Sequence, residues 1–411
     1  MTTAGQAGAL RRLLTSGGLR AVYQQIIDLD TYAPVADEAL VRGPHGSPLE
    51  SPAALFGQAA AAGLLPELDR AARAAIDGAL AAGLRPPHTL FLNVEPSTLN
   101  GAGPLLDREA GELRLVVELT ERALAARPAE VLAAVGWLRE RGCGIALDDV
   151  GIDERSLALM PFLSPDVIKL DMSLIQERRP SRTTARVLNA VAAEAERSGA
   201  TLLAEGVETD AHLARAHALG ATLAQGWYFG RPGELPPPAA VAIGAAVVLR
   251  SGPEPTEGVT PFELIADRLR LRRGDKRLLL ALSRQLENEA LGLGGEAVVL
   301  ATFQDARFFT TESRAKYERL AESAALVGAL GCGLEAEPAP CVRGADLDAD
   351  EALRGEWDVA VIAPHFAGAF VARDLGDNGA DADRRFDYFV TYERELVVAA
   401  ARTLMARIVA R

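Results

Sequence analysis

The stretch "PAEVLAAVGWLRERGCGIALDDV" (residues 128–150) contains the pattern that decides the fold. Its first part has apolar residues at helical spacing and ends at a glycine, which is typical of a helix and its C-terminal cap. Its second part, 144–150, is a short β-rich run with two successive aspartates, Asp148 and Asp149, just before its last residue. The stretch therefore predicts a helix followed by a strand whose carboxyl end carries acidic side chains.

The same alternation continues through the first 235 residues, and 66–83 is a second helical stretch that ends at a glycine. Alternating strands and helices predict a parallel sheet, and this length favours a closed (β/α)8 barrel, with an open, doubly wound sheet as the alternative. The first strand-to-helix turn lacks G-x-G-x-x-G, so a dinucleotide-binding sheet is not indicated. The predicted strands lie at 21–29, 90–94, 115–119, 144–150, 167–171, 201–207 and 223–229.

Two segments rich in proline and glycine, 231–238 and 251–258, divide the chain. Between them, the apolar run 239–249 predicts a short helix. We therefore expect a barrel domain at 1–235, a linker at 236–258 and a smaller α/β domain at 259–411. In this last domain we expect strands at 296–304, 358–364, 369–375 and 385–392, and helices within 313–326 and 393–411.

Composition narrows the classes of function. The 411 residues include 43 basic and 56 acidic ones, for a net charge of -13. Non-specific binding to DNA or to a membrane surface needs a basic face, so we expect neither partner. Three cysteines are too few for a disulfide framework. Without a signal peptide or an apolar run long enough to cross a bilayer, the sequence predicts a soluble, cytoplasmic protein.

Polar side chains cluster at one end of the predicted strands, and Glu38 ends the segment that follows the first of them. In a barrel, the carboxyl ends of the strands form the functional face, so these side chains are expected to meet there. Clustered carboxylates repel one another unless positive charge lies among them. The side chains are Glu38, Asn93, Glu118, Asp148, Asp149, Lys169, Glu205 and Gln225.

An oxygen-rich set without cysteine or histidine favours Mg²⁺ or Mn²⁺ over Zn²⁺. Five acids and one asparagine are enough to bind two ions, with Asp148 or Asp149 as the bridge. A pair of metal ions suits hydrolysis of a phosphate ester. Arg42 is placed to hold a phosphate oxygen, and Lys169 to hydrogen-bond the attacking water or help to deprotonate it.

Taken in order, the motifs of residues 15–235 resemble the EAL-domain family of cyclic di-GMP phosphodiesterases. Single motifs are weak, but the ordered series is very specific. The motifs are "EALVRG" (38–43), "LNVEP" (92–96), "ELTE" (118–121), "ALDDVG" (146–151), "VIKLD" (167–171), "AEGVET" (204–209) and "QGWYFGRP" (225–232). The resemblance implies a modified barrel whose first strand runs antiparallel, and hydrolysis of cyclic di-GMP to linear pGpG.

The resemblance also assigns roles to individual residues. One ion would be bound by Glu38, Asn93, Glu118 and Asp148, and the other by Asp148, Asp149 and Glu205. Lys169 would act on the nucleophilic water, with Glu38 and Glu205 as the other catalytic residues. Glu121 would brace the loop after the two aspartates. The expected substrate contacts are Gln24, Leu40, Arg42 and Gln225, with Glu208 near the site.

Two positions depart from the family pattern. The segment that usually reads DDFGTGYSS is "DDVGIDERS" at 148–156, and the proline that usually follows Gln24 is Gln25. In the family this loop supports the second metal ion and takes part in dimer coupling. We expect a working phosphodiesterase. The alternatives are a receptor that binds cyclic di-GMP and hardly cleaves it, and a metal-dependent hydrolase of another phosphodiester.

Residues 259–411 resemble the DICT domain, a presumed sensory module found beside cyclic di-GMP enzymes. The matching segments include "ATFQDARFFTTESRAKYERL" (301–320) and "EWDVAVIAPHFAGAFVARDL" (356–375). The resemblance implies that an unknown small-molecule or protein signal acts on this domain, and we expect a homodimer.

Overall fold

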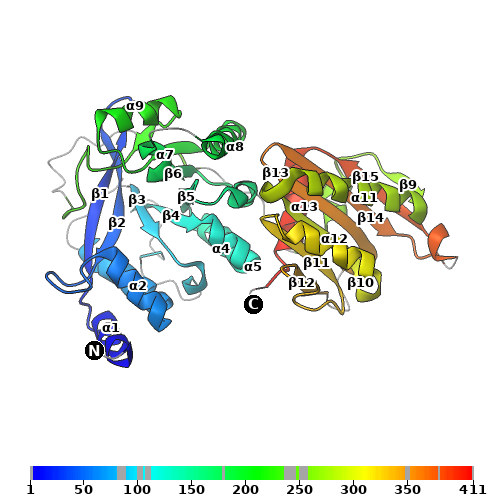
Figure 1. Ribbon diagram of the computed structural model, residues 1–411, viewed down its shortest axis with the longest axis horizontal. Helices are drawn as coiled ribbons and strands as arrows, with labels where there is room; N and C mark the ends of the chain where they lie inside the picture. Colours follow the sequence, from blue (N-terminus) through cyan, green and yellow to red (C-terminus); the bar gives the residue numbers. More distant parts are fainter. Residues whose placement is uncertain are drawn as a thin grey trace.

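Eight strands between Arg20 and Ala224 form a closed barrel (Figure 1). The computed structural model describes residues 3–80, 89–99, 105–106, 113–177, 181–235, 247–249, 258–347, 352–377 and 380–409, without the side chains of 3–6, 121 and 154–156. The strands are β1 (Arg20–Asp28), β2 (Pro34–Arg42), β3 (Thr89–Asn93), β4 (Arg114–Thr120), β5 (Gly144–Val150), β6 (Val167–Leu170), β7 (Thr201–Ala204) and β8 (Leu223–Ala224).

Strand β1 runs antiparallel to both of its neighbours, β2 and β8, and every other neighbouring pair in the barrel is parallel. This confirms the closed barrel with a reversed first strand and excludes the open, doubly wound sheet. One strand, β2, was not predicted from sequence. It carries Asp37 and Glu38 at buried positions, and acidic residues are uncommon in strands.

The barrel helices pack outside the strands. Two of them match the expected stretches, and at the end of α5 Gly142 adopts the left-handed conformation, at φ 73°. The helices are α1 (Thr3–Thr15), α2 (Pro52–Ala62), α3 (Leu65–Leu80), α4 (Glu121–Ala126), α5 (Pro128–Glu140), α6 (Met160–Leu163), α7 (Met172–Gln176), α8 (Arg182–Ser198) and α9 (Asp210–Ala218), with 3₁₀ turns η1 (Pro96–Thr98) and η2 (Glu154–Leu159).

The C-terminal part is a separate seven-stranded sheet in the order β12-β11-β10-β13-β14-β15-β9. Strands β10, β11 and β12 are parallel, and the remaining neighbours are antiparallel. The strands are β9 (Arg272–Asp275), β10 (Val298–Asp305), β11 (Leu326–Cys332), β12 (Arg343–Asp346), β13 (Glu356–Ala363), β14 (Phe366–Asp374) and β15 (Arg385–Thr391). Of these, β9, β11 and β12 were not predicted from sequence.

Helices cover both faces of this sheet. Alternate residues of the central strands pack on α11 and α12 on one side, and the residues between them pack with α10 and α13 on the other. The helices are α10 (Pro261–Ala266), α11 (Lys276–Leu293), α12 (Thr311–Ala321) and α13 (Arg394–Met405), with turns η3 (Gly294–Glu296), η4 (Ala306–Phe308), η5 (Ala352–Gly355) and η6 (Asp381–Asp383). Most of the predicted linker helix, 239–249, lies outside the described residues; 247–249 are not helical.

The two domains lie side by side and share a packed interface (Figure 1). Helix α13 contacts α5 and α6 of the barrel, and Arg402 of α13 donates a hydrogen bond to the carbonyl of Phe162. The N–H of Ala129 donates to the carbonyl of Ile408 at 3.2 Å. Turn η2 of the barrel contacts η3 and β13. Among the described helices, none combines the length and apolar character needed to cross a membrane.

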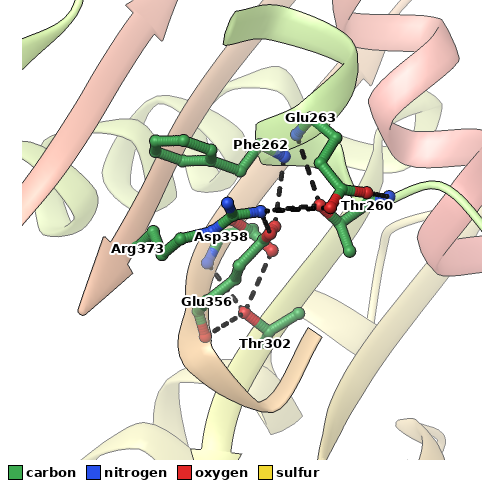
Figure 2. Close-up of polar contacts among 7 residues, drawn as sticks. All are labelled: Thr260, Phe262, Glu263, Thr302, Glu356, Asp358 and Arg373. Carbon is green, nitrogen blue, oxygen red and sulfur yellow. Dashed lines mark hydrogen bonds and ion pairs between the residues drawn. The ribbon is translucent and has the colours of Figure 1, made fainter. Parts of the chain in front are cut away.

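A buried polar cluster joins α10 to the sheet (Figure 2). Glu356 of β13 lies 2.9 Å from Nη2 of Arg373 and accepts a hydrogen bond from the N–H of Phe262 at 3.1 Å. Arg373 in turn stacks on the ring of Phe262, at 4.2 Å from its centre. Two residues along β13, Asp358 is buried beside Thr302. The cluster thus holds the first helix of the domain against the strands.

We expect Asp358→Asn to stabilise the C-terminal domain at pH 8. Burial, together with the charge of Glu356, raises the pKa of Asp358 well above its usual range. The folded state therefore favours the protonated, neutral form of Asp358. The stability that this protonated carboxyl contributes is lost as pH rises through the raised pKa. An amide avoids the loss, so the variant should gain about 1 kcal/mol or more at pH 8 and little at pH 4. Urea unfolding at both pH values measures this; a loss of stability at pH 8 would contradict it.

Candidate active site

A layer of polar side chains lies in the mouth of the barrel, next to the apolar layer that fills its interior. Residues two apart on a strand point to the same side. On each parallel strand the polar residue therefore comes two positions after the apolar one. On β1, which runs antiparallel, it comes two positions before. The apolar layer includes Ile26, Ala36, Phe91, Val116, Ala146, Val167, Leu203 and Leu223. The corresponding polar residues are Gln24, Glu38, Asn93, Glu118, Asp148, Lys169, Glu205 and Gln225.

Lys169 lies at the centre of this layer, and only 1% of its surface is exposed. Its Nζ is 2.7 Å from Oε1 of Glu118, 2.8 Å from Oε1 of Glu205, 3.1 Å from Oδ1 of Asp148 and 3.7 Å from Oε1 of Glu38. Four acids from four different strands or strand ends thus surround one ammonium group. The sequence predicted that these residues meet, and the structure brings them together.

The charges at this centre do not balance, because four carboxylates face one cation. Burial would lower the pKa of Lys169, but the charges of Glu118, Glu205 and the other two acids outweigh it and hold this pKa well above its usual range. Burial raises the pKa of Glu118 well above normal, and the charge of Glu38 adds to the shift. Burial likewise raises the pKa of Glu205 to about 7, against the opposing effect of Lys169. Such perturbed groups concentrate at functional sites.

Amide side chains hold Glu38 in place. Nε2 of Gln225 donates to Oε2 of Glu38 at 2.6 Å, and Nδ2 of Asn93 donates to Oε1 at 3.1 Å. Gln225 also donates to Oε1 of Gln24 at 3.1 Å, and Gln24 donates to the carbonyl of Gly230 at 2.9 Å. The amide network therefore links β1, β2, β3 and the end of β8 around one carboxylate.

A cavity of about 480 Å³ opens beside these acids. Leu40, Arg42, Asn93 and Glu118 line one side of it. Burial lowers the pKa of Arg42, partly offset by the charge of Glu38. Three of the expected substrate and metal contacts thus share a cavity with Arg42, whose guanidinium is only half-buried.

Asp149 lies apart from the four acids around Lys169. The register of β5 against β6 shifts between Leu147 and Val150, and Asp149 has the left-handed φ of 62°. Its Oδ2 is 3.9 Å from Nη2 of Arg122. A non-glycine residue in this conformation is strained, and such strain gathers at functional sites. The bulge interrupts the regular alternation of the strand at Asp149, whose carboxylate lies near Arg122 while that of Asp148 faces Lys169.

Comparison with known families identifies this barrel. A model of the EAL domain matches residues 7–232, more than half of the chain. The chain belongs to the EAL-domain family. A second model, described as "Sensory domain in DIguanylate Cyclases and Two-component system", matches residues 265–375, so the C-terminal part is a DICT domain.

Relatives of the EAL domain include named phosphodiesterases. The cyclic di-GMP phosphodiesterase RocR of Pseudomonas aeruginosa is 34% identical over 158 residues, which cover 37% of this chain and 40% of RocR. The cyclic di-GMP phosphodiesterase NbdA of the same organism is 31% identical over 242 residues, 54% of this chain and 30% of NbdA. The chain therefore spans less than half of either relative.

A third relative, the uncharacterized protein Rv1357c of Mycobacterium tuberculosis, is 30% identical over 245 residues, which cover 54% of this chain and 78% of that protein. Among solved structures, a calcium and cyclic di-GMP complex of BlrP1 from Klebsiella pneumoniae is 27% identical with a TM-score of 0.46. The match covers 53% of this chain and 56% of that one.

The donor groups of the EAL domain suit a hard divalent cation. They are carboxylate and amide oxygens, with an excess of negative charge. Oε2 of Glu118 and Oε1 of Gln225 are buried and, among the described groups, have no hydrogen-bond partner. Within the described residues, no three acids or histidines surround a common point for an ion, because the acids converge on Lys169. Binding an ion would therefore require some of these carboxylates to turn away from Lys169.

The remaining predicted residues are less central. Glu208 is exposed in the loop after β7, and its N–H lies 3.3 Å from Nδ1 of His212. Glu121 begins α4, but its side chain lies outside the described part of the chain. Sequence reasoning missed Arg122, which lies beside Asp149 and directly follows the "ELTE" motif.

Proposed function

We propose that this EAL domain hydrolyses cyclic di-GMP to linear pGpG with the help of two divalent cations, Mg²⁺ or Mn²⁺. The observation that carries the proposal is the set of four acids around Lys169, two buried and two partly buried, whose oxygens outnumber what one ammonium can neutralise. Two named cyclic di-GMP phosphodiesterases among the relatives support the choice of substrate.

Glu38, Asn93, Glu118 and Asp148 would hold one ion, and Asp148, Asp149 and Glu205 the other. When bound, the two ions supply the activated water and stabilise the charge that develops on the phosphate. Arg42 borders the 480 Å³ cavity beside Glu118 and is placed to donate to a phosphate oxygen. Gln24 and Gln225 hold Glu38, and Leu40 supplies an apolar wall of the same cavity.

Lys169 acts as a hydrogen-bond donor in this proposal. Without bound ions, burial opposes but the surrounding acids raise the pKa of Lys169 well above normal, and its Nζ lies within 3.1 Å of oxygens of Glu118, Glu205 and Asp148. Its ammonium orients the nucleophilic water and the oxygens of Glu118 and Glu205.

The proposal includes control of the barrel by the DICT domain. It also places the protein in the cytoplasm, where it functions as a homodimer. Turn η2 follows the two aspartates by a few residues and contacts the DICT domain through η3 and β13. A signal that shifts the DICT domain would therefore act next to Asp149. The segment 150–156 that contains the start of this turn is also where the sequence departs from the family pattern.

A receptor with little turnover is the second candidate. The observation that favours it is the position of Asp149, which lies beside Arg122 at 3.9 Å rather than among the acids around Lys169. If Asp149 stays there, the second cation loses a ligand. The chain would then bind cyclic di-GMP and report it to the DICT domain.

Turnover of cyclic di-GMP separates the two candidates. We expect the full chain with Mg²⁺ or Mn²⁺ to release pGpG, measured by chromatography. Glu38→Gln should lower the rate on the order of 100-fold, because it replaces a charged metal ligand with a neutral amide. Glu140→Gln, an exposed glutamate at the end of α5, is the control and should not change the rate. Saturable binding without product would favour the receptor. If the chain neither binds cyclic di-GMP nor releases product, both candidates are excluded.

A further inference from the structure

A second cavity, unrelated to the barrel, lies in the DICT domain. Its volume is about 330 Å³, which is within the range of small-molecule sites. Helices α11 and α12 form two of its walls, and the ends of β10, β13 and β15 form its floor. Strand β10 is parallel to β11 on one side and antiparallel to β13 on the other. Open α/β sheets bind ligands where strand direction or order changes, outside the carboxyl ends of the strands.

Four aromatic rings line this cavity. Phe303, Phe308, Trp357 and Phe386 line it from four different elements. Trp357 is held edge-to-face against Phe386, with ring centres 5.9 Å apart. Rigid aromatic walls favour a flat aromatic occupant, because stacking and edge contacts depend on ring orientation.

Every lysine or arginine that lines the cavity has an acidic partner that also lines it. Nζ of Lys316 is 2.6 Å from Glu287, and Nζ of Lys276 is 2.6 Å from Asp381. The third pair, Arg284 with Glu312, is 3.3 Å apart. The lining therefore has no net charge. An ion entering it would meet no unpaired opposite charge and would have to break one of these pairs or lose its hydration without compensation.

Gln304 adds a polar group at the end of β10. The register of β10 against β11 shifts between Thr302 and Asp305, and Gln304 has a left-handed φ of 57°. A bulge of this kind redirects a side chain, and strain in a non-glycine residue is common at ligand sites. Gln304 borders the cavity, so its amide is placed to read a hydrogen-bonding group on an aromatic ring.

We propose that this cavity is a binding site for a small, planar heteroaromatic molecule without net charge. The aromatic walls select the shape, the paired ions select against a charged ligand, and Gln304 supplies the polar contact. This inference does not depend on the activity of the EAL domain, and its test measures binding only.

Acridone, a neutral planar ring system with an N–H and a carbonyl, is the probe. We expect one saturable site per full chain, followed by acridone fluorescence and by quenching of tryptophan emission. Acridone carboxylate should bind at least about tenfold more weakly, because its charge is uncompensated. Absence of saturable acridone binding, or tighter binding of the carboxylate, would overturn the proposal.

Two substitutions of α11 locate the site. Ser283 is buried and borders the cavity, whereas Asn288 is exposed on the same helix. Ser283→Met should fill the cavity and abolish saturable binding, and Asn288→Met should bind acridone as the unaltered chain does. Equal affinity in both variants would place the probe elsewhere and defeat the proposal.

A third variant covers the case in which Ser283→Met does not fold. Gln304→Gly removes the amide and accepts the left-handed backbone without strain. We expect it to bind acridone roughly three- to tenfold more weakly, the loss of about one hydrogen bond, while its unfolding temperature is unchanged or higher. Unchanged affinity would remove Gln304 from the site and contradict the polar contact proposed for it.

Discussion

Lys169→Met is expected to destabilise the metal-free protein strongly. The substitution leaves Glu118, Glu205 and Asp148 in the mouth of the barrel without the ammonium that lies about 3 Å from each of them. Loss of one partner from a buried charge pair typically costs about 3–5 kcal/mol. We expect a decrease of that order in the free energy of unfolding at pH 8, measured by urea titration with a metal chelator present.

The loss in free energy of unfolding caused by Lys169→Met should be larger at high pH than at low pH. Burial already raises the pKa of Glu118 well above normal and that of Glu205 to about 7, while Lys169 opposes both shifts. Without Lys169, the folded-state values rise further, so these groups favour the folded state only below the raised values. The variant should therefore be near normal at pH 5 and lose stability as pH rises to 8. An equal deficit at both pH values would contradict the charge argument.

Two further measurements separate charge from packing. Adding Glu118→Gln to Lys169→Met removes one uncompensated charge and should recover part of the stability at pH 8, whereas a purely steric defect would not recover. Mg²⁺ or Mn²⁺ should stabilise Lys169→Met more than the unaltered chain, because the ion takes over the neutralising role. Turnover should fall at least about a hundredfold in both variants.

The position of Lys169 could be predicted from sequence more readily than its role. Strand runs such as 144–150 and 167–171 end in polar residues, and a barrel brings those ends together, so the cluster followed from pattern alone. What the sequence could not show is that the acids converge on the ammonium, because this depends on side-chain distances across the barrel. It also gave no sign that Asp149 would be turned toward Arg122 by a bulge.

Strands with unusual composition were also missed in the prediction of the fold from sequence. Strand β2 has acidic residues at its centre, which make sense only once they form part of a site. Strand β11 contains two glycines, and filling the space at Gly328 would bring a side chain within 2.6 Å of Leu300 and Ile408. Tight packing against neighbouring elements, rather than strand propensity, therefore selects the glycine at this position.

The docking of the two domains leads to the second large effect, expected for Arg402→Met. Arg402 lies on α13 of the DICT domain and donates to the carbonyl of Phe162 in the last turn of α6 in the barrel. Burial lowers the pKa of its guanidinium to about 10, so the group is charged and largely removed from water. A cation at a helix C-terminus stabilises the free carbonyls there, and this one is provided by the other domain.

A matched arginine on the same helix distinguishes docking from the stability of the DICT domain alone. Arg394 donates to the carbonyls of Ala363 and Phe366, at 2.8 and 3.2 Å, within its own domain. Its pKa is also lowered to about 10 by burial. The two residues therefore have similar environments and differ in the domain that accepts their hydrogen bonds. Arg394 also interacts electrostatically with Arg197 and Glu194 of α8 in the barrel, so Arg394→Met should weaken the DICT domain and leave α6 unchanged.

For Arg402→Met we expect faster hydrogen exchange in η2 and α6, by about tenfold or more, since a buried hydrogen bond from a charged group is worth about 1.5–3 kcal/mol. Because η2 follows Asp148 and Asp149 so closely, turnover of cyclic di-GMP should change in the same variant, whereas Arg394→Met should alter neither property. If both variants change exchange in η2 equally, α13 stabilises the barrel through packing alone. If neither does, Arg402 does not couple the DICT domain to the loop, and any control of the active site would have to act through the contacts of η2 with η3 and β13.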